Sequence, residues 1–544
     1  MATAGVTNPA PGMQHWPLLI PKILDHAATI YPRRAIVGAD GEGGLDRSDW
    51  ATLNRRARQV ARAFEALGVK RGDRVATLAW NSIRHLECWY GANGLGAVLH
   101  TINPRLFSEQ IQFIANHAGD AVLLFDAGFA PLVEILRPQL TSVRHFVVLA
   151  DRAHMPAGAG LLCFDELVEA ASADFEWARL DENEPSGLCY TSGTTGDPKG
   201  VLYSHRSNVL HAMATCTTNG FNISARSTIL PVVPMYHANA WGVAFSSAMA
   251  GARLVLNGPH FDAPTLHRLI VEHEVTLTLA VPTVWLAMLD YLDREKLSLG
   301  QLETVIIGGS AVPKTMIEQF RDRFGVTVVQ VWGMTEMSPL GSVALLDLDQ
   351  EQLPSAERTA IQAKQGRPPF GVEMEIVDDA GQSVARDGTA FGHLRVRGPW
   401  TVDRYYAAPA SALDPDGWFD TGDVATIDPG GVMQIVDRSK DVIKSGGEWI
   451  SSAELENAAV GCAGVAEAAV IGIADDKWGE RPLLLIVERA GEIVDLDQVR
   501  AHLATCVARW WIPEQIRIVP DIPHTATGKI SKVQLRRLYA ADGS

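Results

Sequence analysis

Short apolar runs separated by helix-length segments recur along most of the 544-residue chain. One unit of this pattern starts with an apolar run at residues 75–79, continues with a helical stretch ending near residue 95, and closes with a second run at 97–101. Such runs, alternating with helices, are typical of buried strands in parallel α/β sheets. The same pattern predicts further strands at residues 122–125, 146–149, 254–256, 305–307 and 326–331.

The pattern changes in the last third of the chain. Residues 372–377 and 393–397 alternate apolar and polar positions between glycine turns, which predicts a small β subdomain. Beyond it we expect a strand–turn–strand unit, two helices and two further strands, followed by a basic tail. These elements are predicted at residues 431–443, 452–459, 466–472, 482–487 and 496–507.

A charged DRSKD segment at residues 437–441 lies between two apolar strands. Because hinges are short segments that absorb backbone rotation, we expect one here. The predicted division is an N-terminal domain at 1–437, a hinge at 438–441 and a C-terminal domain at 442–544. The predicted fold class is α/β: a large multi-subdomain N-terminal domain with mostly parallel sheets and a small β subdomain, plus a small mobile α+β C-terminal domain.

Composition narrows the functional classes. Apolar residues make up 47% and charged residues 20%, as in globular proteins. The net charge of −16 argues against nucleic acid as a main partner, although a local basic pocket for a small anion remains compatible with it. An apolar stretch at residues 278–289 is too short to span a bilayer, so we expect no membrane partner. The first residues lack signal-peptide features, which favours a cytoplasmic protein with reduced cysteines.

The segment YTSGTTGDPKG, residues 190–200, holds three glycines, four Ser/Thr hydroxyls and Lys199. Glycines allow backbone amides to approach a ligand closely, and hydroxyls and a lysine add donors and charge. The segment therefore favours a polyphosphate site, although composition alone fits a flexible polar loop equally well. It is not a Walker A loop, because GxxxxGK[ST] occurs nowhere in the chain.

The order of residues in this segment resembles the signature loop of the adenylate-forming superfamily. That superfamily comprises acyl- and aryl-CoA synthetases, luciferases and peptide-synthetase adenylation domains. Four later segments resemble further motifs of that family in the same order. They are VWGMTE at 331–336, GWFDTGD at 417–423, DRSKDVIKSGGEWIS at 437–451 and TATGKISK at 525–532.

The resemblance implies ATP, Mg²⁺ and coenzyme A as cofactors. Thr335 would contact the α-phosphate, and Mg²⁺ would be held by Glu336 and Thr191, because hard oxygens suit that ion. An isolated glutamate would more simply be a surface residue. The residues implied to bind phosphates are Thr191, Ser192, Gly193, Thr194, Thr195 and Lys199.

For the nucleoside, the resemblance implies that Asp423 accepts bonds from the ribose hydroxyls and that Arg438 makes a second contact there. A turn-forming role is the alternative for Asp423. The adenine would lie between a GGS turn at 308–310 and the 330–335 segment. The residues implied on that side are Gly309, Ser310, Trp332 and Gly333.

Lys529 resembles the family lysine that contacts the attacking carboxylate and the α-phosphate, where positive charge offsets repulsion between two anions. Lys440 matches the hinge position. His524 stands where the family usually has a more basic residue. After rotation of the small domain, the loop after the hinge would approach the pantetheine arm of coenzyme A; its residues are Lys444, Ser445, Gly446 and Gly447.

The segment VPMYHANAWG, residues 233–242, resembles the pocket motif of medium-chain fatty-acid and methylmercaptopropionate CoA ligases. It implies that His237 lies near the carboxylate and that Trp241 walls the acyl pocket. Gly308 and Pro339 complete the expected pocket. A bulky indole shortens a pocket, although Trp241 and His237 could instead be ordinary core residues.

We therefore expect an acyl-CoA ligase that joins a short- or medium-chain acid, such as a fatty acid or 3-(methylthio)propionate, to coenzyme A through an acyl-adenylate. The alternatives are a stand-alone adenylation enzyme that loads a carrier protein, an aryl-CoA ligase, a luciferase-like oxygenase and a non-catalytic nucleotide-binding protein. The expected partners are the acid, ATP and coenzyme A. The oligomeric state stays open, with a homodimer as one option.

Overall fold

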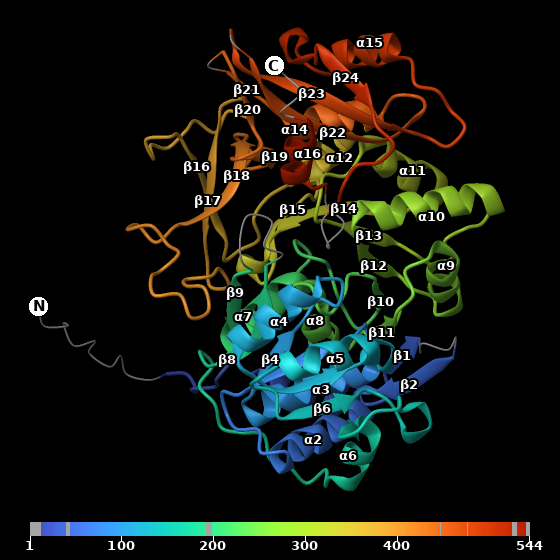
Figure 1. Ribbon diagram of the computed structural model, residues 1–544, viewed down its shortest axis with the longest axis vertical. Coiled ribbons are helices and arrows are strands. Elements are labelled where there is room, and N and C mark those ends of the chain that lie inside the picture. The colour runs from blue at the N-terminus through green and yellow to red at the C-terminus, as the bar shows by residue number, and fades with distance from the viewer. Residues whose placement is uncertain are drawn as a thin grey trace, which may run out of the picture.

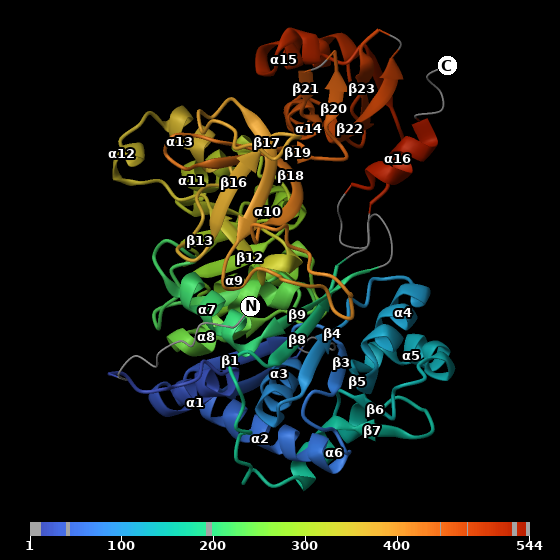
Figure 2. The same ribbon diagram turned by 90° about the vertical axis from the view of Figure 1, so that its left-hand side faces the viewer.

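Four β-sheets and the helices that cover them form the computed structural model, which describes residues 12–39, 44–191, 198–446, 448–475, 477–524 and 530–539. Figures 1 and 2 show the C-terminal residues, in red, at one end of the molecule, above the larger N-terminal part. Two sheets are mostly parallel and two are mostly antiparallel. This arrangement confirms the predicted fold class.

The first sheet has seven strands in the order β7-β6-β5-β3-β4-β8-β9. The β8–β9 pair is antiparallel and forms a hairpin at the sheet edge, whereas the other pairs are parallel. The strands are β3 Arg74–Leu78, β4 Val98–Thr101, β5 Asp120–Phe125, β6 His145–Val148, β7 Leu161–Cys163, β8 Pro185–Tyr190 and β9 Gly200–Ser204.

The second sheet has eight strands in the order β15-β14-β13-β12-β10-β11-β1-β2. Its inner pairs are parallel and its two edge strands pair antiparallel. The strands are β1 Ala35–Ala39, β2 Leu45–Asp49, β10 Thr228–Pro231, β11 Arg253–Leu256, β12 Leu277–Ala280, β13 Thr304–Ile307, β14 Thr327–Gly333 and β15 Leu340–Val343.

One apolar core lies between these two sheets and includes residues of α1, α2, α3, α7 and α8. Helices α4 and α5 cover the opposite face of the seven-stranded sheet, and α9, α10 and α11 cover that of the eight-stranded sheet. Burial on both faces explains the nearly continuous apolar runs of the strands. The helices are α1 Ile20–Ile30, α2 Trp50–Ala66, α3 Ile83–Leu95, α4 Ser108–Ala118, α5 Ala130–Leu136, α6 Phe164–Ala170, α7 His205–Cys216, α8 Val243–Ala250, α9 Ala263–Glu272, α10 Pro282–Glu295, α11 Lys314–Phe324, α12 Leu348–Glu351 and α13 Ser355–Gln362.

The third sheet is antiparallel, with four strands in the order β16-β17-β18-β19. Its apolar face packs against residues of β9 and against Met337, so it lies beside the hairpin that carries the 190–200 segment. The strands are β16 Glu373–Val377, β17 Phe391–Arg397, β18 Phe419–Ile427 and β19 Met433–Arg438.

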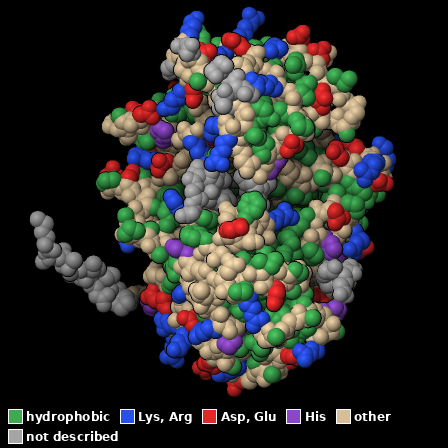
Figure 3. All heavy atoms as spheres, in the orientation of Figure 1, with side chains coloured by type: hydrophobic (Ala, Val, Ile, Leu, Met, Phe, Trp, Pro, Cys, Tyr) green, Lys and Arg blue, Asp and Glu red, His purple; other side chains and the backbone are tan. Residues whose placement is uncertain are grey.

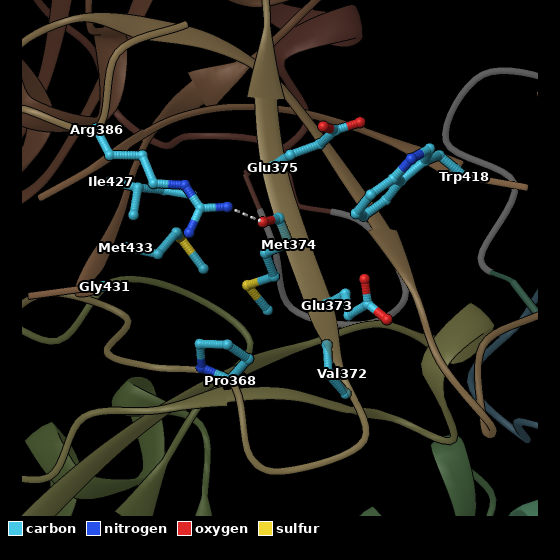
Figure 4. A pocket seen from close by; sticks show the side chains of 10 residues that line it. All are labelled: Pro368, Val372, Glu373, Met374, Glu375, Arg386, Trp418, Ile427, Gly431 and Met433. Atoms are coloured by element: carbon cyan, nitrogen blue, oxygen red, sulfur yellow. Dashed lines mark hydrogen bonds between the residues drawn. The ribbon is translucent and has the colours of Figure 1, made fainter. Parts of the chain in front are cut away.

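A cavity of about 370 Å³ opens on this sheet. Figure 4 shows Arg386 lying over Met374, whose carbonyl oxygen accepts a 2.6 Å hydrogen bond from the guanidinium. Glu373 and Glu375 project to the other side of β16. None of the described residues predicted to bind substrate lines this cavity, so it lies apart from the predicted site.

The fourth sheet has the strand order β21-β20-β23-β22, with β24 added parallel to β23. Apolar clusters join it to α14, α15 and α16. The sequence pattern missed β21, β24 and α16, which it treated as loop or tail. The elements are β20 Ile443–Ser445, β21 Glu448–Ile450, β22 Val465–Asp475, β23 Gly479–Glu488, β24 Gln515–Ile518, α14 Ser452–Val460, α15 Leu496–Cys506 and α16 Lys532–Tyr539.

Acidic and basic side chains are interspersed over the face seen in Figure 3, so the negative net charge does not form one continuous acidic surface there. The six cysteines are free thiols, as expected, but Cys506 is exposed rather than part of a core. No helix within the described ranges is long and apolar enough to cross a bilayer.

Candidate active site

The β8–β9 hairpin and two hydrogen bonds between Thr191 and Lys199 close the base of the predicted phosphate loop. The hairpin pairs Tyr190 of β8 with Gly200 of β9. Beyond that pair, the Thr191 N–H donates to the Lys199 carbonyl at 2.9 Å, and the Lys199 N–H donates to Thr191 Oγ1 at 3.2 Å. The hairpin therefore fixes both ends of the loop. The predicted ligands Ser192, Gly193, Thr194 and Thr195 lie outside the described residues.

The two segments predicted to hold adenine follow neighbouring parallel strands. Residues 308–310 follow β13, and Trp332 and Gly333 end β14, so both lie at the carboxyl edge of the eight-stranded sheet. Ligands of open α/β sheets bind at this edge. A Cβ atom on Gly308 would lie 2.8 Å from the Val331 side chain, and one on Gly333 would lie 2.0 Å from the Pro339 carbonyl oxygen. Backbone therefore approaches backbone closely here, which explains both glycines.

At the predicted ribose position, three residues from distant parts of the chain meet. The Trp332 indole N–H donates to Asp423 Oδ2 at 3.0 Å, and Arg438 Nε lies 2.8 Å from Asp423 Oδ1. Asp423 pairs with Arg438 across the β18–β19 ladder and is only 3% exposed. The carboxylate is thus held by a neutral and a charged donor, and as an acceptor-only group it is of a type suited to a diol.

Thr335 and Glu336 lie in a 3₁₀ turn, η5 (Thr335–Met337), directly after β14. The Tyr203 hydroxyl of β9 donates to the Thr335 carbonyl at 2.8 Å, which ties η5 to the phosphate hairpin. Glu336 is buried, and its Oε1 accepts a 2.8 Å hydrogen bond from the Tyr405 hydroxyl. The Lys199 ammonium lies 4.9 Å from the centroid of the Tyr405 ring. The structure thus brings Lys199, Glu336 and Thr335 together.

Tyr203 and Tyr405 were not among the predicted site residues. Each connects elements that are far apart in sequence, and neither belongs to a motif with a fixed spacing to the residue that it contacts. Only the three-dimensional packing of β9, η5 and the 402–406 segment reveals them. Burial and the adjacent Glu336 carboxylate raise the pKa of Tyr405 well above its ordinary value, so the phenol stays protonated and remains a donor.

The donor set fits a magnesium ion shared with a substrate. Within the described residues, no group of three or more His, Cys, Asp or Glu side chains is arranged to hold a metal. Mg²⁺ in phosphoryl-transfer sites is commonly held by one or two carboxylates together with substrate phosphates. The buried carboxylate of Glu336, beside Lys199 of the predicted phosphate loop, matches that arrangement.

On the predicted acyl side, η4 (Ala238–Gly242) follows His237 and has an unusual backbone. All five of its residues have φ between 42° and 78°. Left-handed conformation costs roughly 1–2 kcal/mol for each residue with a side chain, and such strain tends to occur at functional sites. This turn places the indole tip of Trp241 3.2 Å from the position of a Cβ on Gly308.

Trp241 is 6% exposed and belongs to the core between the two parallel sheets, so it is a core aromatic whose tip also reaches the 308–310 turn. His237 is half-buried, and its backbone N–H donates to the Pro234 carbonyl at 3.0 Å. Pro339 is buried beside Gly333 and follows a cis peptide bond. Trp241 therefore lies beside Gly308, and Pro339 lies beside Gly333.

The residues predicted to meet coenzyme A lie in the C-terminal sheet. The Lys444 N–H donates to Glu480 at 3.0 Å, and Ser445 Oγ lies 3.3 Å from an Arg481 guanidinium nitrogen. Gly446 has φ +61°, and its N–H donates to the Trp478 carbonyl at 2.7 Å. Gly447 lies outside the described residues.

Lys440 is exposed. It lies between a residue that contacts the four-stranded sheet and a residue that contacts the C-terminal helix α16. Before it, the Ser439 N–H donates to the Gly422 carbonyl of the four-stranded sheet at 2.9 Å. After it, Asp441 pairs at 2.6 Å with Arg536 of α16, in the C-terminal part.

Lys529 also lies outside the described residues, but the positions on either side of residues 525–529 are fixed. His524 forms a β-bridge with Ile530, and its Nε2 lies 2.7 Å from Glu467 Oε1. Two residues later, Lys532 pairs at 2.9 Å with Glu456 of α14. The pair is largely buried, so removal of either partner would leave an unpaired buried charge at the start of α16.

Comparisons with known proteins show to which family the chain belongs. The chain matches the family described as AMP-binding enzyme over residues 24–406 and the family described as AMP-binding enzyme C-terminal domain over residues 454–529. It is 48% identical to a 3-methylmercaptopropionyl-CoA ligase of Ruegeria lacuscaerulensis over 96% of this chain and 98% of that protein. It is 46% identical to a medium-chain-fatty-acid–CoA ligase of Ectopseudomonas oleovorans, over 96% of each.

Among solved structures, an anthranilate CoA ligase in complex with anthranoyl-AMP superposes with a TM-score of 0.87 at 25% identity, over 97% of this chain and 99% of that one. Sequence and fold thus agree over nearly the whole chain, which confirms the resemblance predicted from the motifs. The protein belongs to the AMP-binding enzyme family.

Proposed function

We propose that the protein is an AMP-forming acyl-CoA ligase that acts on a short- or medium-chain carboxylic acid, either a fatty acid or 3-(methylthio)propionate. The choice of acid depends on one observation: the Trp241 indole reaches the turn at Gly308, where the acyl pocket would meet the adenine site. A bulky ring at this position would shorten the acyl pocket, so the pocket would favour a short or medium acyl chain over a long one. The two relatives named above, which are ligases for such acids, support the same choice.

In the first half-reaction, a carboxylate oxygen of the acid attacks the α-phosphorus of ATP, and the bond to pyrophosphate breaks. The backbone amides and Lys199 of the phosphate loop would hold the β- and γ-phosphates, while Thr335 contacts the α-phosphate. Asp423 and Arg438 would fix the ribose, and the 308–310 turn with Trp332 would hold adenine. His237 would orient the carboxylate.

Glu336 and Thr191 would hold Mg²⁺, which when bound neutralises charge on the β- and γ-phosphates. Lys529 would approach the reacting oxygens, where its ammonium offsets repulsion between two anions. In the second half-reaction the thiol of coenzyme A attacks the acyl carbonyl carbon, the bond to AMP breaks, and the thiol proton is lost to solvent. The 444–447 loop would guide the pantetheine arm.

The two half-reactions need different residues from the C-terminal part, so we propose a rotation about residues 438–441, with domains at 1–437 and 442–544. The change of contacts at Lys440 supports this pivot, because Ser439 is held by the four-stranded sheet and Asp441 by α16. A contact of Asp437 with the C-terminal part restricts how this rotation can occur. Its carboxylate accepts a 2.7 Å hydrogen bond from the Ser452 N–H, so rotation must break that contact or carry residue 437 along.

The proposal is tested by incubating the protein with ATP, Mg²⁺, coenzyme A and a panel of acids from about three to twelve carbons, including 3-(methylthio)propionate, with acyl-CoA detected by mass spectrometry. We expect thioesters from the shorter acids and release of AMP and pyrophosphate. The absence of a thioester from every acid would reject the ligase assignment. A thioester formed on a carrier protein but not on coenzyme A would favour the adenylation-enzyme alternative.

The role of Lys529 is tested separately with Lys529→Ala. Adenylate formation should be lost, whereas conversion of supplied acyl-adenylate to acyl-CoA should continue. Equal loss of the two half-reactions would contradict both the assigned role and the rotation.

A further inference from the structure

A short connecting segment, residues 402–406, links the two parts of the site that would face the phosphates of ATP. The Val402 N–H donates to the carbonyl of Glu336 at 2.7 Å, and the Tyr406 N–H donates to the carbonyl of Gly200 at 2.7 Å. One end of the segment is therefore attached to η5 and the other to the end of the phosphate loop. Side chains between these two attachments are held in a fixed relation to both.

Tyr405 lies within this segment and contacts both parts. Its hydroxyl donates to Glu336 Oε1 at 2.8 Å, and its ring lies beneath the Lys199 ammonium, 4.9 Å from the ring centroid. The ring also packs against the apolar cluster of the four-stranded sheet, which limits its rotation. Tyr405 therefore has support on its ring and a directed polar group at its tip.

The hydrogen bond has a consequence for Glu336. A carboxylate can rotate about its terminal bond, and its orientation is broad unless a partner fixes it. With Oε1 bonded to Tyr405, rotation of the carboxylate is restricted, and among the described residues no hydrogen bond to Oε2 occupies the lone pairs that a cation would need. A phenol suits this task, because it is neutral and does not compete with Mg²⁺ for the carboxylate by charge.

We infer that Tyr405 is a positioning residue for the metal carboxylate: its hydroxyl orients Glu336 so that the carboxylate can hold Mg²⁺ against the β- and γ-phosphates of ATP. The inference rests on the proposed role of Glu336. Tyr405 does not contact substrate in this assignment and acts through Glu336.

Equilibrium binding of ATP, measured by titration calorimetry without acid or coenzyme A, tests the inference in the full-length protein. The measured quantity is the gain in ATP affinity when Mg²⁺ is added. We expect Tyr405→Phe, which keeps the ring, to reduce this gain roughly tenfold or more, as for loss of a hydrogen bond to a charged group. ATP affinity without Mg²⁺ should change little. An unchanged gain in Tyr405→Phe would overturn the inference.

Tyr406→Phe is the matched control. Its hydroxyl donates to the Ala118 carbonyl at 3.2 Å, away from Glu336, and it lies in the same segment. It should keep the wild-type gain; an equal loss there would mean that the segment as a whole, and not the Tyr405 hydroxyl, determines binding.

Glu336→Gln separates this inference from the proposed function. If Glu336→Gln keeps the wild-type gain with Mg²⁺, the metal assignment itself fails. If it loses the gain whereas Tyr405→Phe does not, the role of Glu336 stands and only the role of Tyr405 is rejected. Thermal unfolding of each variant shows whether a loss of binding reflects a loss of fold.

Discussion

The indole N–H of Trp332 donates to the carboxylate of Asp423 at 3.0 Å, although the two residues are 91 positions apart in sequence. The bond joins β14 of the eight-stranded sheet to β18 of the four-stranded sheet. Because Trp332 ends a strand at the predicted adenine site and Asp423 is the predicted ribose ligand, one contact connects the two halves of the nucleoside site.

Replacement of Asp423 tests that site. Asp423→Asn removes the negative charge that Arg438 pairs with and one acceptor for a ribose hydroxyl. We expect ATP affinity to fall roughly 10- to 100-fold, as for loss of hydrogen bonds to a charged group. Titration calorimetry measures the affinity, and the exposed Asp416→Asn, from the loop before β18, provides the control. Equal affinities of Asp423→Asn and wild type would place Asp423 in a purely structural role.

Much of this site could be predicted from the sequence because its residues lie in contiguous motifs. The motifs indicated Gly308 and Gly333 as site residues, and the structure adds the close approach of neighbouring atoms that explains both glycines. Strands such as β13 and β14 were predictable because burial on both faces leaves a continuous apolar run. These motifs and strands could be predicted because each depends on residues that are close together in sequence.

Through-space contacts could not be predicted in the same way. Tyr405 contacts Glu336 although the two residues are 69 positions apart in sequence, a separation that carries no periodic signal. The left-handed turn at 238–242 contains alanines and a tryptophan, which individually disfavour positive φ. Helix α16 was missed because its N-terminal anchor, the buried Lys532–Glu456 pair, depends on a partner in α14. In each case the decisive interaction comes from a distant part of the chain.

Trp241 provides a test of acyl-chain preference. Trp241→Ala should lengthen the pocket and raise kcat/KM for octanoate relative to butyrate by roughly tenfold or more, because each added methylene can contribute about 1–3 kcal/mol. The change also removes a large buried side chain, at a cost of about 3–5 kcal/mol in stability. Thermal unfolding should therefore accompany the acid panel. A variant that folds and keeps the wild-type profile would assign Trp241 to the core alone.

His211 provides a prediction about acid stability. It is fully buried, its Nε2 accepts a 3.2 Å hydrogen bond from the Leu340 N–H, and its Nδ1 has no partner among the described residues. Burial lowers the pKa of His211 to about 3 from an ordinary value of 6.5. At pH values above 6.5 the ring is neutral in both the folded and the unfolded chain, so the stability of the folded state is not reduced by this residue. As the pH falls below 6.5, the unfolded chain takes up a proton that the folded chain cannot, so stability declines until about pH 3.

Between about pH 7.5 and pH 5, His211 alone should lower the free energy of unfolding by about 2 kcal/mol. His211→Gln removes the titration, so urea titrations at the two pH values should show a smaller difference by that amount. A His211→Gln protein with the full wild-type pH dependence would contradict the assignment.

Gly446 allows the two half-reactions to be separated by backbone geometry. It has φ +61°, and a Cβ there would lie 2.7 Å from the Trp478 ring. Gly446→Ala must therefore displace either the turn or the indole, in addition to a left-handed cost of about 1–2 kcal/mol. Because this turn would guide the pantetheine arm only after rotation, we expect conversion of supplied acyl-adenylate to fall at least about tenfold while adenylate formation is retained.

Gly491→Ala distinguishes local crowding from general strain in the C-terminal part. Gly491 has φ +83°, but a Cβ there would meet no atom within 4 Å. Gly491→Ala should therefore have a similar conformational cost. The rates of both half-reactions should stay near wild type, since Gly491 lies in the turn between β23 and α15. If Gly446→Ala and Gly491→Ala slow thioester formation equally, the loss reflects destabilisation of the sheet. If only Gly446→Ala does so, the close approach of this turn to Trp478 is needed for transfer to the thiol.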